Sequence, residues 1–245
     1  MRDHLSAGLV VIGNEILSGK VTDTNTPFLA RELRSLGVTL ERVVVIPDDI
    51  GQIASEVAAF SRRYDVVFTS GGVGPTHDDV TMDGIAAAFG RPMVEHAELR
   101  GAIESFVGHR VNAAHLKMAQ IPEGAELVVD DKLAFPTVVV GNVYVLPGIP
   151  ELFEAKIHSL RDRFRSSPYF LRQVLVRDNE TRIAEFLNAT LSAFPELLLG
   201  SYPKLSDPDY RVRLTLESKD ESYVDRALED LVGRLPAGCV FRVEH

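Results

Sequence analysis

The sequence predicts an α/β protein, a three-layer αβα sandwich with a mostly parallel sheet, followed by a small α+β domain of ferredoxin-like arrangement. Three observations predict it. Short apolar runs alternate with helix-like segments early in the chain, a glycine-rich turn follows the third run, and the last third shows the order β-α-β-β-α-β. Alternating strands and helices are typical of right-handed βαβ units in doubly wound sheets. The second order is that of ferredoxin-like domains.

The first domain, which we place at residues 1–166, begins with three predicted buried strands. They are apolar runs without alternation, at residues 9–12, 43–46 and 66–68. Such runs are typical of parallel strands covered on both faces. Helices separate them: one ends at Gly37, and the next repeats Ile53, Val57 and Phe60 on one face.

Residues 69–81, Thr-Ser-Gly-Gly-Val-Gly-Pro-Thr-His-Asp-Asp-Val-Thr, are the most informative segment, and they join a buried strand to a helix predicted over residues 82–89. Glycines permit left-handed torsions and close approach, so backbone N–H groups in such a turn bind an anion. Asp78 and Asp79 would repel a phosphate there unless a divalent cation lies between them. The alternative is that Asp79 or Thr81 caps the helix, but a cap does not explain the glycines.

Ligands of doubly wound sheets bind beyond the carboxyl ends of the strands. We therefore expect three loops to converge at one edge of the sheet: residues 13–25, 47–49 and 71–79. The first places Glu15, Asp23 and Asn25 after a buried strand, where either ligand contact or ordinary loop polarity accounts for them. It is not a P-loop, because the spacing is one residue too long and Val21 replaces the required Ser or Thr.

The remaining segments complete both domains. We predict a helical middle at 95–119, a hairpin of strands 137–140 and 143–146, and a helix at 151–164. The polar residues 165–168 mark the boundary to a second domain at 167–245. Its predicted strands are 169–176, 197–202, 210–217 and 239–243, and its helices are 181–194 and 224–235.

Two features of the second domain concern single side chains. Cys239 is predicted to face the core, because free cysteines are usually buried. Arg211 and Arg213 share the wet face of an alternating strand, and Lys204 lies in the loop before it. Such residues are usually plain surface. The alternative is that they reach over the phosphate site, since arginine binds phosphate bidentately.

Composition excludes several classes. A net charge of -9 and a pI of about 5.3 argue against nucleic acid as the partner. A single cysteine excludes disulfides within the chain, and scattered histidines without metal-ligand spacing argue against zinc. The chain shows neither a signal peptide nor a membrane-spanning run, so we expect a cytoplasmic protein with no membrane partner. The Gly-x-Ser-x-Gly elbow of serine hydrolases is absent.

The three loops together resemble the molybdopterin-binding-like domain family, which includes molybdopterin adenylyltransferases, gephyrin domains and the N-terminal domain of competence/damage-inducible protein A. The segments that carry the resemblance are 13–19 with 23–25, 48–49 and 70–81. Three further segments, 116–122, 142–151 and 200–203, resemble the version fused to eukaryotic FAD synthases. The resemblance covers nearly the whole chain.

The resemblance implies a divalent metal (Mg²⁺, Mn²⁺ or Co²⁺), a small phosphorylated ligand such as a dinucleotide or molybdopterin, and a homo-oligomer. In the competence-protein and FAD-synthase branches it implies hydrolysis of a pyrophosphate bond in ADP-ribose or FAD. The alternatives are a protein that binds molybdopterin without catalysis, and adenylyl transfer to molybdopterin. Two departures bear on substrate and metal: Asn14 stands where many members carry Asp, and residues 130–136 lack the Asn-Pro-x-Gly pattern of the competence branch.

Loop pattern and resemblance together assign Asp49 and Asp79 as catalytic and metal-binding residues. The residues expected to contact the substrate or its phosphate are Glu15, Asp23, Asn25, Gly71, Gly72, Gly74, Pro75, Thr76, Asp78, Thr81, Lys117, Gly148 and Arg211.

Overall fold

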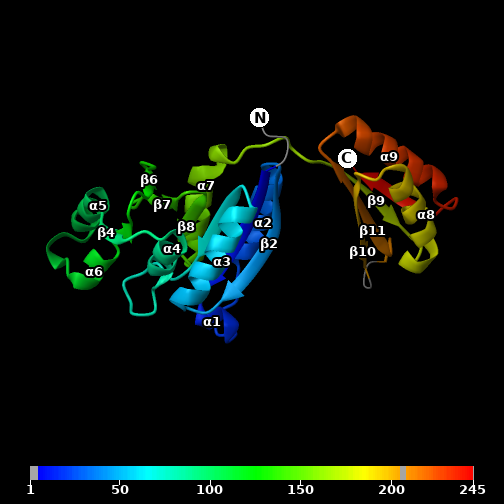
Figure 1. Ribbon diagram of the computed structural model, residues 1–245. Coiled ribbons are helices and arrows are strands. Elements are labelled where there is room, and N and C mark those ends of the chain that lie inside the picture. Colours follow the sequence, from blue (N-terminus) through cyan, green and yellow to red (C-terminus); the bar gives the residue numbers. More distant parts are fainter. Residues whose placement is uncertain (1–4, 205–207, 245) are drawn as a thin grey trace. The chain divides into compact units, whose positions relative to one another are not determined.

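The computed structural model describes residues 5–204 and 208–244. The chain divides into two compact units, Met1–Ser166 and Ser167–His245. Each unit has its own sheet and its own helices (Figure 1). None of the helices within the described ranges is long and apolar enough to cross a bilayer.

A six-stranded sheet forms the centre of the first unit, in the order β2-β1-β3-β8-β7-β6. Its strands are β1 Leu5–Ile12, β2 Val38–Ile46, β3 Val66–Ser70, β6 Glu126–Val128, β7 Thr137–Val140 and β8 Val143–Leu146. Strand β1 pairs in parallel with β2 and β3, and β3 pairs in parallel with β8. Only the β8–β7–β6 end is antiparallel. The predicted mostly parallel sheet is confirmed.

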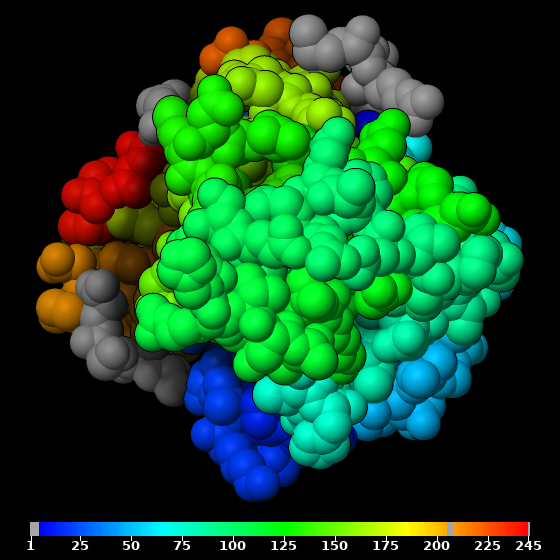
Figure 2. Space-filling view, turned by 90° about the vertical axis from the view of Figure 1, so that its left-hand side faces the viewer, coloured from blue at the N-terminus to red at the C-terminus, as the bar shows by residue number. Residues whose placement is uncertain are grey.

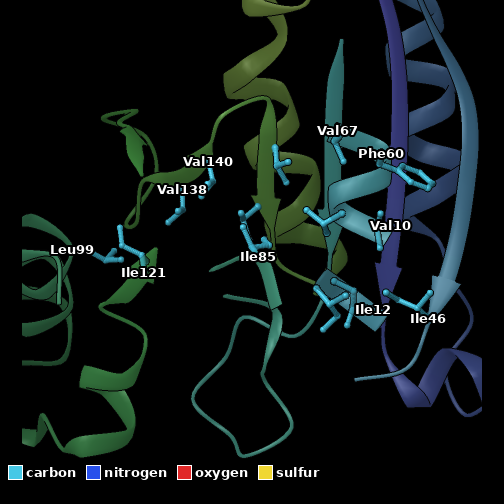
Figure 3. Close-up of a cluster of buried hydrophobic side chains, with 14 of the residues drawn as sticks. Val10, Ile12, Ile46, Phe60, Val67, Ile85, Leu99, Ile121, Val138 and Val140 are labelled. Carbon is cyan, nitrogen blue, oxygen red and sulfur yellow. The ribbon is translucent and has the colours of Figure 1, made fainter. Parts of the chain in front are cut away.

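Helices cover both faces of this sheet. They are α1 Asn14–Leu17, α2 Asn25–Ser35, α3 Ile50–Arg63, α4 Thr81–Phe89 and α7 Pro150–Leu160, which is followed by a 3-10 turn, Arg161–Arg163. On one face, Val10 and Ile12 pack with Phe60 of α3 and Ile85 of α4 (Figure 3). On the other face, the cluster around Phe68 includes residues of α2 and α7. The two buried clusters confirm the three-layer αβα sandwich.

The segment between α4 and β6 differs from the single helical stretch expected at 95–119. It contains a two-stranded antiparallel sheet of β4 Met93–Glu95 and β5 Gln120–Pro122. Between these strands lie α5 Ala97–Val107, a 3-10 turn Gly108–Arg110 and α6 Ala113–Lys117. Helix α5 ends because Gly108 adopts a positive φ of 66°, which L side chains rarely adopt. Figure 2 looks onto the face of the first unit that carries α5 and α6.

The second unit has the predicted ferredoxin-like arrangement. Its elements are β9 Phe170–Val176, α8 Glu180–Ala193, β10 Leu198–Pro203, β11 Val212–Ser218, α9 Glu221–Arg234 and β12 Val240–Glu244. The antiparallel order is β10-β11-β9-β12. Both helices contribute to one buried cluster, which includes Cys239 at 6% exposure, as predicted. Strand β11 begins at Val212, so Arg211 precedes the strand instead of lying on its wet face.

Candidate functional site

Two pockets lie where β1, β3 and β8 end. The first, here called the loop pocket, has a volume of about 180 Å³ and is lined by Gly72, Val73, Gly74, Asp79, Met82, Asp83, Met93, Lys117, Met118 and Gln120. The second, the strand-end pocket, has a volume of about 80 Å³ and is lined by Val11, Ile12, Glu15, Ile16, Val21, Thr22, Asp23, Thr24, Asn25, Ser70, Gly71, Gly148 and Pro150. Because Gly71 and Gly72 are consecutive, the loop after β3 contributes to both.

The backbone of this loop is held in a conformation that suits glycine. Gly71 has a φ of 105°, and a Cβ atom there would lie 2.1 Å from the carbonyl oxygen of Ile12. Gly72 has a φ of 63°. The Thr81 hydroxyl donates to the carbonyl oxygen of Gly71 at 2.9 Å, and the Thr81 N–H donates to that of Gly72 at 3.0 Å. Thr81 therefore fastens the loop to the start of α4, and any side chain at Gly71 would break this arrangement.

The capping alternative for α4 is wrong. The N-cap residue is Val80, and no side chain caps the helix. Asp79 instead closes the loop itself, since its Oδ2 accepts hydrogen bonds from the Thr76 N–H at 2.8 Å and from the Thr76 hydroxyl.

Three consecutive N–H groups of the loop have no protein acceptor within the described ranges. They belong to Gly72, Val73 and Gly74, all of which line the loop pocket. The loop leads into the N-terminus of a nine-residue helix, whose first N–H groups also carry partial positive charge. Free backbone donors next to a helix N-terminus are typical of phosphate sites.

Carboxylates share the loop pocket with these donors. Asp79 and Asp83 line it, whereas Pro75, Thr76 and Asp78 are exposed and do not. The Thr76 hydroxyl oxygen lies 2.5 Å from Asp78 Oδ1 as well as from Asp79 Oδ2, so the two carboxylates share its single proton. This hydroxyl lowers the pKa of the Asp78 carboxyl below its usual value, with smaller contributions from the Asp78 backbone N–H, His77 and Lys117. Asp78 thus stays ionised at neutral pH beside the loop.

Lys117, at the end of α6, holds the loop from the other side. Its ammonium group donates to the carbonyl oxygens of Thr76 at 2.5 Å and of Asp79 at 2.9 Å. The resemblance implied a ligand contact for this residue; the structure gives it a contact with the loop and a place in the pocket wall. A cation that binds the loop's carbonyls partly offsets the charge of the neighbouring carboxylates.

Asn25 organises the strand-end pocket. Its side chain is 5% exposed, and its Nδ2 donates to the Ser70 hydroxyl at 3.0 Å and to the Gly148 carbonyl at 2.9 Å. Its Oδ1 is buried and accepts no hydrogen bond from the described residues. A buried acceptor without a partner is costly, so this oxygen marks a position for a ligand donor or a cation.

The sequence predicts that Glu15 and Asn25 belong to a loop at residues 13–25, but the structure places both in helices. Glu15 lies on the short helix α1 and Asn25 begins α2. Asp23 precedes α2, and its carboxylate accepts hydrogen bonds from the N–H and the hydroxyl of Thr26. Short helices of this kind are set by tertiary packing more than by local propensity.

Asp49 has a structural partner. It is the N-cap of α3, where its Oδ1 accepts from the Gln52 N–H at 2.8 Å. It does not line the loop pocket with Asp79. Over the described ranges, no group of three or more His, Cys, Asp or Glu side chains is placed to hold a metal ion.

Arg211 and Lys204 lie in the second unit. The Lys204 N–H donates to the Arg211 carbonyl at 2.7 Å, and Arg211 is exposed. Arg213 lies on β11 with its guanidinium 5.3 Å from the centre of the Tyr202 ring. The expected contact between Arg211 and the phosphate stays a prediction.

Six residues of the loop pocket were not among the predicted site residues: Val73, Met82, Asp83, Met93, Met118 and Gln120. Asp83 could have been predicted from the sequence, since it lies two residues after Thr81 in the first turn of α4. Met93 and Gln120 lie on strands of three residues, which are too short to show a period.

A family model described as "Probable molybdopterin binding domain" matches residues 8–166. The chain belongs to this family. A second model, "FAD synthase, middle domain", matches residues 168–244 of the chain. The resemblance to the version found in FAD synthases is thereby confirmed.

Two relatives match the chain over both units, and a solved structure matches about two thirds of it. A protein of Archaeoglobus fulgidus is 36% identical over 221 residues, which are 90% of this chain and 94% of the relative. A probable FAD synthase of Caenorhabditis elegans is 34% identical over an alignment of 275 positions, which covers all of this chain and 53% of the relative. The chain thus spans about half the length of that protein. The crystal structure of the protein CinA from Thermoplasma acidophilum superimposes with a TM-score of 0.61 at 29% identity, covering 66% of this chain and 99% of that one.

Proposed function

We propose that the first unit binds the diphosphate of a nucleotide such as ADP-ribose or FAD in the loop pocket and hydrolyses it to two monophosphates. The observation that carries the proposal is the set of free N–H groups at Gly72, Val73 and Gly74, which share the pocket with the Asp79 carboxylate. Backbone donors hold phosphate oxygens, while a carboxylate beside them serves a metal ion or an attacking water.

The carboxylates of the loop pocket suit a divalent metal ion that binds together with the phosphate groups of the substrate. Mg²⁺ usually binds one or two protein carboxylates, water and substrate phosphates, and needs no cage of protein ligands. Asp79 and Asp83 supply that number of carboxylates. A bound divalent ion would neutralise charge on the diphosphate and make it a better electrophile.

Residues of the chain orient the diphosphate and hold the loop in place. The N–H groups of the loop would orient the diphosphate, and Lys117 and Thr81 keep the loop in place from two sides. Asp79 accepts both Thr76 hydrogen bonds at Oδ2, so its Oδ1 stays available. In the reaction, a water oxygen bonds to one phosphorus, and the bond from that phosphorus to the bridging oxygen breaks, so that the other monophosphate leaves with this oxygen. The proton of the water passes to the available Asp79 Oδ1.

The strand-end pocket serves the sugar in this proposal. Its lining includes two acceptors, the unpartnered Asn25 Oδ1 and the Glu15 carboxylate, beside the hydroxyl groups of Thr22, Thr24 and Ser70. Acceptors repel phosphate and attract hydroxyl groups. We therefore reassign both residues from phosphate contact to hydroxyl contact.

The test is turnover of ADP-ribose and FAD with Mg²⁺, Mn²⁺ or Co²⁺, followed by chromatography of the monophosphates. Asp79→Asn should cut turnover at least about 100-fold at an unchanged melting temperature, because the amide keeps the shape and loses the charge. Asp162→Asn removes an exposed carboxylate that lines neither pocket and should leave turnover unchanged. Full turnover in Asp79→Asn would refute the assignment.

A second candidate is binding of molybdopterin without catalysis. The description of the matching family model favours it. Tight binding of a pterin phosphate, with no metal-dependent turnover above a heat-inactivated control, would establish this function instead.

A further inference from the structure

We propose that an apolar chamber next to the loop pocket binds the uncharged aromatic ring of the ligand whose phosphate lies at the loop. The proposal rests on the proposed function and names the part of the substrate that would give selectivity. The chamber has a volume of about 160 Å³ and is lined by Val73, Met82, Leu99, Ile103, Met118, Phe135, Pro136, Val138, Val145, Pro147, Leu152 and Lys156.

The chamber and the loop pocket are neighbours with a common wall. Val73, Met82 and Met118 line both. One molecule can therefore place a phosphate at the free N–H groups and a ring beyond the methionines. Methionine side chains adapt to irregular shapes and make favourable sulfur contacts with aromatic rings.

The chamber offers no free charge to a ligand. Its one charged residue is Lys156, and the ammonium group already donates to the carbonyl oxygens of Phe135 at 3.0 Å and Pro136 at 2.9 Å and to the Thr137 hydroxyl at 3.4 Å. All three ammonium protons thus have acceptors. A phosphate or carboxylate would lose its hydration here without compensation, whereas an uncharged ring would not.

The size of the chamber suits a ring. An apolar cavity of about 150 Å³ in an engineered protein binds benzene. Leu152 of α7 lines the chamber at 50% exposure, so this wall meets solvent and a ring larger than benzene can extend outward. Flat rings joined to phosphates occur in nucleotides, as bases and flavins, and in pterin phosphates, so the chamber favours such ligands over simple sugar phosphates.

The experiment compares ring binding with phosphate binding by calorimetry. Titrations of FAD and of pyrophosphate use Ca²⁺ as the divalent ion, with chromatography to verify that no product forms. Val138→Phe fills the chamber from β7, and Val129→Phe makes the same change at an exposed residue that does not line it. Leu152→Glu places a charge at the exposed wall, where folding tolerates it.

We expect Val138→Phe and Leu152→Glu to weaken FAD binding at least about tenfold and to change pyrophosphate binding less than about twofold. Val129→Phe should match the wild type for both. Wild-type FAD affinity in both chamber variants would overturn the proposal. This holds even if light scattering shows that the substitutions change the oligomeric state of the protein. If Val138→Phe fails to fold, Leu152→Glu decides.

Riboflavin and adenosine separate this proposal from the proposed function, because neither carries a phosphate. If wild-type protein binds no pyrophosphate, the proposed function fails and the chamber is still judged by these two probes. Binding of either probe that Leu152→Glu abolishes supports the chamber. If the wild type binds neither riboflavin nor adenosine, the chamber proposal is overturned.

Discussion

The ammonium group of Lys117 lies 2.9 Å from the carbonyl oxygen of Asp79, a residue 38 positions earlier in the chain. The same group donates to the Thr76 carbonyl, so α6 and the loop after β3 are joined at the wall of the loop pocket. The bonds tie one end of the segment between α4 and β6 to the candidate site.

Lys117→Met should therefore loosen the loop. Methionine keeps the length of the side chain and removes both donors, so we expect faster amide hydrogen exchange at residues 76–79 and turnover lowered at least about tenfold. Lys132→Met, at an exposed residue, is the matched control. Wild-type exchange at the loop in Lys117→Met would contradict the proposed positioning role.

Gly71→Ala should destabilise the first unit by about 3 kcal/mol or more, because the backbone conformation disfavours L residues and the new Cβ meets the Ile12 carbonyl oxygen. Gly101→Ala should have the opposite effect on stability. Gly101 lies in α5 with open space around it, and alanine there should stabilise by about 0.5–1 kcal/mol. Urea unfolding followed by circular dichroism measures both, and equal midpoints for the two variants would show that the loop conformation is not required.

Asp49 is the N-cap of α3 and is also the residue that the sequence assigns to a metal ion, and two substitutions separate these roles. Asparagine caps helices about as well as aspartate, whereas alanine costs about 0.5–2 kcal/mol. If Asp49 holds a metal ion, as its resemblance-based assignment predicts, Asp49→Asn should keep the melting temperature and lower turnover, and Asp49→Ala should lower both. Full turnover in Asp49→Asn, with destabilisation confined to Asp49→Ala, would leave Asp49 as the cap of α3 alone.

The stability of the first unit should depend on pH through Lys156. Burial lowers the pKa of this amine from an ordinary value of 10.5 to about 8. Below pH 8, folded and unfolded states are both protonated, and the cost of burying the charge is fully present. Between pH 8 and 10.5 the unfolded state binds more protons, so Lys156 makes the free energy of unfolding rise with pH. Wild type should gain stability over Lys156→Met between pH 7 and 9.5; parallel urea midpoints for the two proteins would contradict this.

Several elements were predictable because local sequence decides them. The apolar runs at residues 66–68 and 143–146 identified β3 and β8, and Gly141–Asn142 identified the hairpin between β7 and β8. In the second unit, the spacing of apolar residues predicted each element in the correct order. These patterns are short-range, so a single sequence contains them.

The site was only partly predictable. The glycine-rich turn indicated where the free backbone N–H groups lie, since glycine is the residue that adopts the conformation at Gly71. Nothing local indicated that Asn25 donates to Ser70 and Gly148, which lie 45 and 123 residues away. Likewise, Met93 and Gln120 meet the loop pocket through a sheet of three-residue strands.

The sequence by itself determined the strands of four or more residues, the glycine turn, the acidic residues beside it and the two-part organisation, because periodicity and backbone preference act over a few neighbouring residues. The tertiary structure alone decided which of the acidic residues lines a pocket, which one caps a helix, and that an apolar chamber adjoins the loop. Those outcomes depend on contacts between residues far apart in the chain, and their free energy is gained only when the helices pack on the sheet.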